Sequence, residues 1–187
     1  VTRTVRDMLS IHMRRKLHKD SDGVDEETLR KAYDEVFGRD NLFLYDHFGS
    51  TETDNLLSKM RYMVTSLGVR FILLDHISIV VSGIGDGDER RIIDNLVTQL
   101  RTFVEETGVT LLMVSHLKRP EGKGHEEGAV TSLSQLRGSA SLGQLSDRVI
   151  GLERDQQDAD QANKVTVRVL KDRFDGATGI AGYLSYD

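Results

Sequence analysis

Two polar side chains follow apolar runs that have the length and composition of buried β-strands. Asp75 comes directly after the run 69–74, and His116 comes just after the run 109–114. The carboxyl ends of neighbouring parallel strands meet at one edge of an α/β sheet, where such sheets bind ligands. A carboxylate at that edge can hold Mg²⁺, and an imidazole can contact a terminal phosphate. Each residue alone is more often structural, but together they predict a polar site at this edge.

Two cationic segments could bind phosphate groups. The first is a Gly-rich loop whose cations are Lys118, Arg119 and Lys123. Cations spaced along such a loop suit contacts with nucleic-acid phosphates. The second segment is Lys171-Asp172-Arg173, at the end of an alternating strand. The alternatives are an ordinary solvated loop for the first segment and charged protection of a strand edge for the second.

The motifs that would complete a nucleotide or metal site are absent from the sequence. It has no phosphate-binding loop of the form G-x-x-x-x-G-K-[ST], no G-x-G-x-x-G and no H-E-x-x-H. It also has no cysteine, which excludes disulfides and thiolate metal sites. The residues by themselves therefore support an α/β domain with a polar site at its sheet edge, and no more.

Hydrophobic spacing predicts alternating strands and helices. Helices are expected over 1–19, 25–37, 51–67, 88–107 and about 134–145, and strands over 42–45, 69–74, 109–114, about 149–152, 164–171 and 180–186. Strand–helix–strand units of this kind form a parallel sheet with helices on its faces. The alternation of Val165, Val167 and Val169, followed by the turn Asp175-Gly176, predicts an antiparallel hairpin added to that sheet.

Composition and charge fit a folded globular protein. Of the 187 residues, 38% are hydrophobic and 29% are charged, and no apolar run is long enough to span a membrane. The net charge of −5 argues against a broadly basic nucleic-acid coat. Residues 1–19, however, carry +5 and the remainder carries −10. This basic segment is either the solvated face of an amphipathic helix or a contact with DNA or with a neighbouring subunit.

Short motifs along the chain carry a resemblance to a known family. They are Leu74-Asp75-His76-Ile77-Ser78-Ile79-Val80-Val81, Asp88-Glu89-Arg90, Ser115-His116-Leu117-Lys118, His125-Glu126-Glu127-Gly128, Leu136-Arg137-Gly138-Ser139, Gln144-Leu145-Ser146-Asp147, Leu152-Glu153-Arg154 and Gly179-Ile180-Ala181-Gly182-Tyr183. Their order and spacing closely resemble the helicase half of the primase–helicases of short-tailed phages. The bacterial replicative helicases and the mitochondrial helicase Twinkle are related to these enzymes. The resemblance is strong over 40–187 and weak over 1–39, so we expect a helical N-terminal segment, 1–39, and the C-terminal part of a motor domain, 40–187.

The resemblance implies an α/β fold with a RecA-like core, in which a mostly parallel sheet is flanked by helices and ends in an antiparallel C-terminal hairpin. Members form rings, usually of six identical subunits, and hydrolyse ATP or dTTP with Mg²⁺ at the subunit interfaces. They move 5′ to 3′ along single-stranded DNA and unwind the duplex. The implied partners are single-stranded DNA, neighbouring subunits, a primase domain and a DNA polymerase, without a membrane. The implied location is the cytoplasmic replication fork of a phage or bacterium rather than the mitochondrial matrix.

The resemblance also implies roles for individual residues. At the nucleotide, Asp75 would serve magnesium, His116 would be the γ-phosphate sensor, and Arg154 and Tyr186 would be the pair that sandwiches the base. Lys171 and Arg173 would be the cations given to the neighbouring subunit's nucleotide. Those at DNA would be Lys118, Arg119 and Lys123 in one channel loop and Ser82 and Gly83 in the other. Arg137 and Gln144 would couple DNA contact to the nucleotide site.

The sequence departs from the family pattern in three places. The phosphate-binding loop is missing, and the catalytic Glu would lie before Val1, because the first Glu of the chain is Glu26. Gly143 stands where the phage relatives carry a basic residue. We therefore expect part of a helicase motor that is inactive alone. The alternatives are a RecA-like recombinase or clock-type ATPase, and a non-catalytic module that binds DNA or a partner and lacks the phosphate loop.

Overall fold

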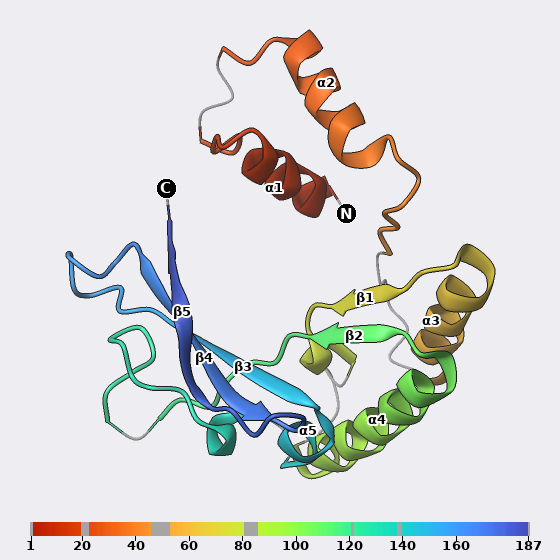
Figure 1. Cartoon of the computed structure of the whole chain (residues 1–187), viewed down its shortest axis with the longest axis vertical. Helices are drawn as coiled ribbons and strands as arrows, with labels where there is room; N and C mark the ends of the chain where they lie inside the picture. Colours follow the sequence, from red (N-terminus) through yellow and green to blue (C-terminus); the bar gives the residue numbers. More distant parts are fainter. Residues whose placement is uncertain are drawn as a thin grey trace. The chain divides into compact units, whose positions relative to one another are not determined.

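The computed structural model describes residues 2–19, 23–45, 53–80, 86–120, 122–137 and 140–186. The chain divides into two compact units, Val1–Ser50 and Thr51–Asp187 (Figure 1). Among the described residues, no helix combines the length and the apolar character that crossing a membrane requires.

The first unit contains the helices α1 (Thr2–His12) and α2 (Glu26–Phe37). Asp25 caps α2 at its N-terminus. Its Oδ1 accepts a hydrogen bond from the backbone N–H of Thr28 at 2.7 Å, and this bond holds the pKa of Asp25 below its ordinary value. His12 Nε2 lies 2.8 Å from Glu35 Oε2 and links the two helices.

Two predictions for this unit are wrong. The helix expected over 1–19 ends at His12. The N–H of Arg15 donates to the carbonyl of Ser10 at 2.9 Å, and Arg14 takes a left-handed φ of 52°, which closes the helix end. Residues 42–45, expected as a strand, belong to no sheet in the described part of the chain. An apolar run indicates a tendency to be buried, but it does not supply a partner strand.

The second unit contains the predicted strand–helix–strand arrangement. Its first elements are α3 (Thr53–Leu67), β1 (Phe71–Leu74), the 3-10 helix η1 (Ile77–Val80), α4 (Asp86–Thr107) and β2 (Thr110–Met113). β1 and β2 pair in parallel, with Phe71 opposite Thr110 and Leu74 opposite Met113. The prediction of two parallel neighbours is therefore confirmed, and both strands end at the same edge of the sheet.

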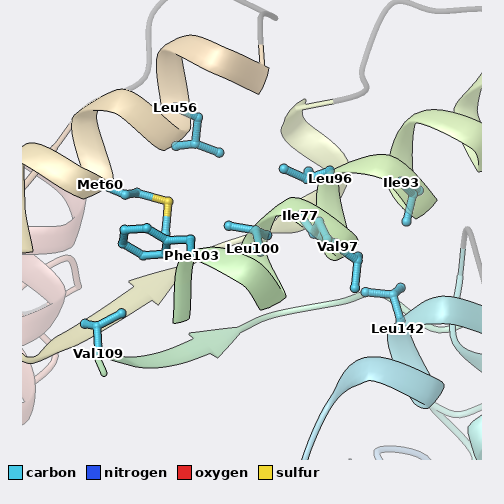
Figure 2. Packing of buried hydrophobic residues seen from close by; sticks show 10 residues of the cluster. All are labelled: Leu56, Met60, Ile77, Ile93, Leu96, Val97, Leu100, Phe103, Val109 and Leu142. Carbon is cyan, nitrogen blue, oxygen red and sulfur yellow. The ribbon is translucent and has the colours of Figure 1, made fainter. Parts of the chain in front are cut away.

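Helix α4 contributes more buried side chains to the core of this unit than any other described element. Its apolar stripe at three- and four-residue spacing is buried and consists of Ile93, Leu96, Val97, Leu100 and Phe103. Figure 2 shows this stripe in one cluster with Leu56 and Met60 of α3, and with Ile77, Val109 and Leu142. The stripe forms because a 3.6-residue helical period brings these positions to one side of the helix.

The two faces of the parallel pair differ. Ile72 and Leu74 pack against the core cluster. Phe71 and Leu73 alternate with them along β1 and are 67% and 68% exposed. Parallel sheets are ordinarily covered on both faces, so the second face of this sheet is unusually bare.

The C-terminal strands form a second, antiparallel sheet in the order β3 (Arg148–Glu153), β4 (Lys164–Asp172) and β5 (Gly179–Ser185). The predicted hairpin is confirmed, with Val165 opposite Leu184. Within the described residues this sheet is separate from the parallel pair, since no ladder joins β2 to β3. A cavity of about 560 Å³ lies between them, lined by residues that include Leu100 and Val104 of α4, Leu112 of β2 and Ile150 of β3.

The helix expected over 134–145 is instead two short helices, η2 (Leu133–Gln135) and α5 (Ala140–Leu145). Leu136 leaves the helical conformation, with φ −57° and ψ 125°, and forms an antiparallel bridge with Leu117. The prediction of one continuous helix is wrong because this bridge draws the chain out of the helix.

Candidate nucleotide and DNA site

The ends of β1 and β2 are joined by backbone hydrogen bonds. The N–H of Val114 donates to the carbonyl of Leu74 at 2.9 Å, and the N–H of Ile77 donates to the carbonyl of Val114 at 3.0 Å. The rings of His76 and His116 meet edge to face, with centroids 4.3 Å apart and planes at 62°. The two polar strand ends found in the sequence are therefore brought to one place, with the Asp75 and His116 side chains exposed there.

This edge also holds polar atoms without a protein partner. His76 Nδ1 and Ser78 Oγ are buried and form no hydrogen bond with any residue that the structure describes. A buried polar atom without a partner is costly, so such atoms in a folded protein mark a place where another group is expected. Sequence reasoning did not single out either atom, because burial without a partner depends on tertiary packing.

The donor set at this edge fits a metal ion that arrives with phosphates. Mg²⁺ usually keeps several waters and binds one or two carboxylates together with substrate phosphates. Asp75 supplies one exposed carboxylate. In the described part of the chain, no group of three or more His, Cys, Asp or Glu side chains could hold a metal by itself. The residues present therefore suit magnesium bound to a nucleotide and do not suit a closed metal cage.

The stem of the cationic loop starts from the same edge. The N–H of Arg137 donates to the carbonyl of His116 at 3.0 Å, and the N–H of Lys118 donates to the carbonyl of Gln135 at 2.7 Å. Between these bonds lies the bridge that joins Leu117 to Leu136. The candidate phosphate sensor and the backbone of Arg137 are thus in direct contact, although they belong to different motifs in the sequence.

The cations of the loop differ in their surroundings. Lys118 is exposed. Arg119 lies 3.5 Å from Glu126, and Lys123 Nζ lies 3.6 Å from Asp155 Oδ2. A DNA phosphate would therefore compete with a carboxylate for Arg119 and for Lys123.

The loop is also docked on the connection between β3 and β4. The N–H of Gln156 donates to the carbonyl of Glu126 at 2.8 Å, and Glu127 forms a bridge with Asp155. Gly128 has a φ of +80°, and a Cβ there would lie 2.8 Å from Asp155 Oδ2, so this close approach requires glycine. Burial acts to raise the pKa of Asp155, but the backbone N–H groups of Asp158 and Gln157, together with Lys123, outweigh it and lower the pKa.

A buried ion pair anchors the end of the loop. Glu153 Oε1 accepts from the backbone N–H and the hydroxyl of Thr131, each at 2.8 Å, and from Arg168 Nε at 2.7 Å. The Glu153 side chain is only 8% exposed. Burial acts to raise the pKa of Glu153, but the hydrogen bonds from Arg168 and Thr131 outweigh it, and the pKa lies below its ordinary value.

The two cations at the end of β4 contact the segment that follows α5. Lys171 Nζ donates to the carbonyls of Gly143, Gln144 and Ser146 at 2.7, 2.9 and 2.9 Å. Arg173 donates to the carbonyl of Gln144 at 2.9 Å and to the carboxylate of Asp147 at 3.1 Å. The Gln144 side chain itself is exposed. These cations are therefore engaged within the chain.

Arg154 and Tyr186, expected around a nucleotide base, lie together. The guanidinium carbon of Arg154 is 4.4 Å from the centre of the Tyr186 ring, and Arg154 Nε donates to the carbonyl of Ala162. At this separation a planar base cannot lie between the two groups, so it would have to displace one of them. Ser82 and Gly83, expected in the other channel loop, lie outside the described residues.

Three acidic residues at this site were not assigned a role from the sequence. Glu153 anchors Thr131, Asp155 faces Lys123, and Asp147 faces Arg173. Glu153 and Asp147 lie within short motifs that carried the family resemblance, which was the available signal. Nothing in the sequence indicated Asp155.

Comparisons with known proteins agree on the kind of domain. The family model of the DnaB-like helicase C-terminal domain matches residues 1–184. The chain is 49% identical over 190 residues to the DNA helicase/primase of Enterobacteria phage T3. That match covers 98% of this chain and 33% of the relative, so the chain spans about a third of the length of this curated relative.

Two solved structures share the fold. An ATPase domain superposes with a TM-score of 0.74 at 23% identity, over 98% of this chain and 65% of that one. A KaiC-like protein from Pyrococcus horikoshii superposes with a TM-score of 0.55 at 16% identity, over 88% of this chain and 72% of that one. At these identities the likeness concerns the fold alone, and it confirms the RecA-like class that the motifs implied.

Proposed function

Because this chain belongs to the DnaB-like helicase C-terminal domain family, we propose that it is the part of a replicative DNA helicase that links nucleotide hydrolysis to movement on DNA. The motor would use a nucleoside triphosphate to move 5′ to 3′ along single-stranded DNA and unwind the duplex. The observation that carries the proposal is the direct connection between the strand edge and the loop stem. His116 lies at the end of β2, its carbonyl binds the N–H of Arg137, and the loop begins two residues later at Lys118.

On the nucleotide side, Asp75 would hold the magnesium ion and His116 would contact the γ-phosphate. When bound, Mg²⁺ neutralises charge that develops on the phosphates during transfer. The unpartnered Nδ1 of His76 and hydroxyl of Ser78 support this assignment, since a hydrated ion or a phosphate could supply the missing partner. ATP and dTTP are both compatible with this chemistry.

The phosphate-binding loop would come from residues outside this chain. Support comes from the cavity of about 560 Å³ between β2 and β3 and from the bare face of β1. A strand placed between β2 and β3 would join the two sheets and cover apolar side chains such as Leu112 and Ile150, which are 52% and 58% exposed. We use "complete motor" for this chain joined to that unit, in its own full-length protein or as a chimera with the T3 relative.

On the DNA side, the exposed Lys118 would contact backbone phosphates, and Arg119 and Lys123 would do so after leaving their carboxylate partners. Arg137 and Gln144 would transmit DNA contact to the nucleotide edge. The complete motor would work as a ring of identical subunits and would need no membrane. A primase domain and a DNA polymerase are its proposed partners at a cytoplasmic replication fork.

The test compares unwinding by the complete motor with that of two variants. Asp75→Asn should abolish nucleotide hydrolysis and unwinding of a forked duplex, because the carboxylate that serves magnesium is lost. Asp160→Asn removes an exposed acid in the β3–β4 connection and should leave both activities unchanged. Full activity of Asp75→Asn would contradict the assignment of this sheet edge as the magnesium and nucleotide site.

A second measurement concerns the isolated chain. We expect no phosphate release above background with Mg²⁺, nucleotide and single-stranded DNA, because the phosphate cradle is absent from the sequence. Turnover at about 1 s⁻¹ or faster would contradict the proposal. Strand exchange or nucleotide hydrolysis without unwinding by the complete motor would favour the recombinase or clock-type alternative. DNA binding without any hydrolysis would favour the non-catalytic module.

A further inference from the structure

The ammonium of Lys171 caps the end of a helix. Lys171 lies on β4, and its Nζ donates to the carbonyls of Gly143, Gln144 and Ser146 at 2.7, 2.9 and 2.9 Å. These carbonyls belong to the last turn of α5 and the residue after it. The last carbonyls of a helix lack intrahelical partners and form the negative end of its dipole, so a cation stabilises them.

The cap uses the whole donor capacity of Lys171. A lysine ammonium has three N–H donors and no acceptor. All three have a carbonyl partner here, so Lys171 cannot also donate to a phosphate without leaving at least one of them. Arg173 strengthens the same contact through the carbonyl of Gln144 at 2.9 Å and the carboxylate of Asp147 at 3.1 Å.

We propose that Lys171 is a positioning residue that holds the end of α5 and releases it when a phosphate of the neighbouring subunit's nucleotide takes the ammonium. The proposal rests on the proposed function for the phosphate. When a phosphate binds the Lys171 ammonium, the end of α5 loses its cap. Since α5 carries Gln144 and follows the stem that includes Arg137, the nucleotide of one subunit would thereby act on the DNA-loop stem of the next.

The first experiment tests the cap on the isolated chain, where no nucleotide of a neighbour is present. Hydrogen exchange is measured at the backbone amides of α5 and Ser146, whose N–H donates to the carbonyl of Leu142 at 3.3 Å. Lys171→Met keeps the length of the side chain and removes all donors, and we expect exchange at least about tenfold faster. Lys164→Met is the matched control on the same strand, because the Lys164 ammonium lies over the Tyr183 ring and not at α5. Equal protection of α5 in wild type and Lys171→Met would overturn the cap.

A second variant covers the case in which Lys171→Met unfolds the whole chain. Lys171→Arg keeps the charge, but its planar fork cannot point donors at three converging carbonyls. We then expect faster exchange confined to α5 and Ser146, with the amides of β1 and β2 unchanged. If Lys171→Met unfolds the chain, protection of α5 in Lys171→Arg equal to that in wild type would also overturn the cap.

The third measurement tests the release in the complete motor. Addition of a non-hydrolysable nucleotide to wild-type rings should lower protection of α5, whereas Lys171→Met rings should be unprotected before and after. Unchanged protection in rings that hydrolyse nucleotide would show that the cap is permanent and would overturn the release. If the wild-type motor neither assembles nor hydrolyses, the proposed function fails, while faster exchange in the isolated Lys171→Met chain would still support the cap.

Discussion

The edge of the β1–β2 sheet and the β3–β4–β5 sheet differ in whether their polar side chains have protein partners. At the first edge, Asp75 and His116 are exposed, and the buried Nδ1 of His76 lacks a partner. In and directly after the second sheet, the cations have partners within the chain. Arg168 pairs with Glu153, and Arg173 pairs with Asp147. The first region is therefore open to an incoming group, and the second already satisfies its own charges.

This difference predicts how each region can change during a reaction. A group at the open edge needs only to bind its ligand, because among the described residues no hydrogen-bonded or ionic partner of its side chain must first be displaced. A cation in the second sheet must exchange one partner for another, so its present partner helps to set its affinity for a phosphate. The same distinction separates two exposed lysines of the loop. Lys118 has no ion-pair partner among the described residues, whereas Lys123 lies beside Asp155.

The largest expected effect concerns Arg173. We expect its exchange of Asp147 for a phosphate of the neighbouring nucleotide to be essential for hydrolysis. In the complete motor, Arg173→Ala should lower nucleotide hydrolysis by about 10³-fold or more, because an arginine finger stabilises charge as the γ-phosphate leaves. Binding of nucleotide and assembly of the ring should persist. Hydrolysis is measured as phosphate release in the presence of single-stranded DNA.

A mixing experiment establishes whether Arg173 acts on its own subunit or on the next. Subunits with Arg173→Ala are mixed with subunits that lack the lysine of the phosphate-binding loop, each inactive alone. Mixed rings should regain part of the hydrolysis, because an intact pocket then meets an intact Arg173 from its neighbour. No rescue in rings shown to contain both subunits, or normal hydrolysis by Arg173→Ala alone, would contradict action in trans.

The open edge was easier to predict from the sequence than the partners in the second sheet. The position of Asp75 and His116 follows from two apolar runs and the topology that parallel pairing imposes. The partners of Lys123 and Arg173 depend on how distant segments pack, and no spacing in the sequence encodes that. Local spacing also failed at 134–145, where the pairing of Leu136 with Leu117 interrupts the expected helix.

The next effect concerns stability of the second sheet. Glu153→Gln should lower the free energy of unfolding by about 2–4 kcal/mol at neutral pH, because it removes the buried carboxylate and leaves the partly buried Arg168 guanidinium without its counter-charge. The pKa of Glu153 is lowered in the folded chain, so its ionised form stabilises the fold above the ordinary value of 4.5. This contribution is lost as the pH falls through the lowered pKa, so wild type and variant should converge in acid.

Denaturant unfolding of the isolated chain at several pH values measures this effect. Glu106→Gln is the matched control, since Glu106 pairs with Arg61 at 2.6 Å but both side chains are about half exposed. An exposed ion pair contributes at most about 1 kcal/mol, so this variant should change little. Equal losses for the two variants, or a loss for Glu153→Gln that does not depend on pH, would contradict the role of the buried pair.

The smallest expected effect concerns the partner exchange of Lys123. In the complete motor, Lys123→Ala should reduce the slope of log affinity for single-stranded DNA against log salt by about one unit, because one phosphate contact is lost. Asp155→Asn should instead raise the affinity about two- to fivefold at unchanged slope, because an exposed ion pair of modest strength no longer competes for the ammonium. Fluorescence anisotropy with an oligo-dT strand measures both the affinity and its salt dependence, and Lys164→Ala, outside the loop, should alter neither.

An unchanged slope in Lys123→Ala with unwinding intact would make this segment an ordinary solvated loop. Weaker binding by Asp155→Asn would mean that Asp155 holds Lys123 in the position that DNA requires, and the contrast between Lys118 and Lys123 would then disappear.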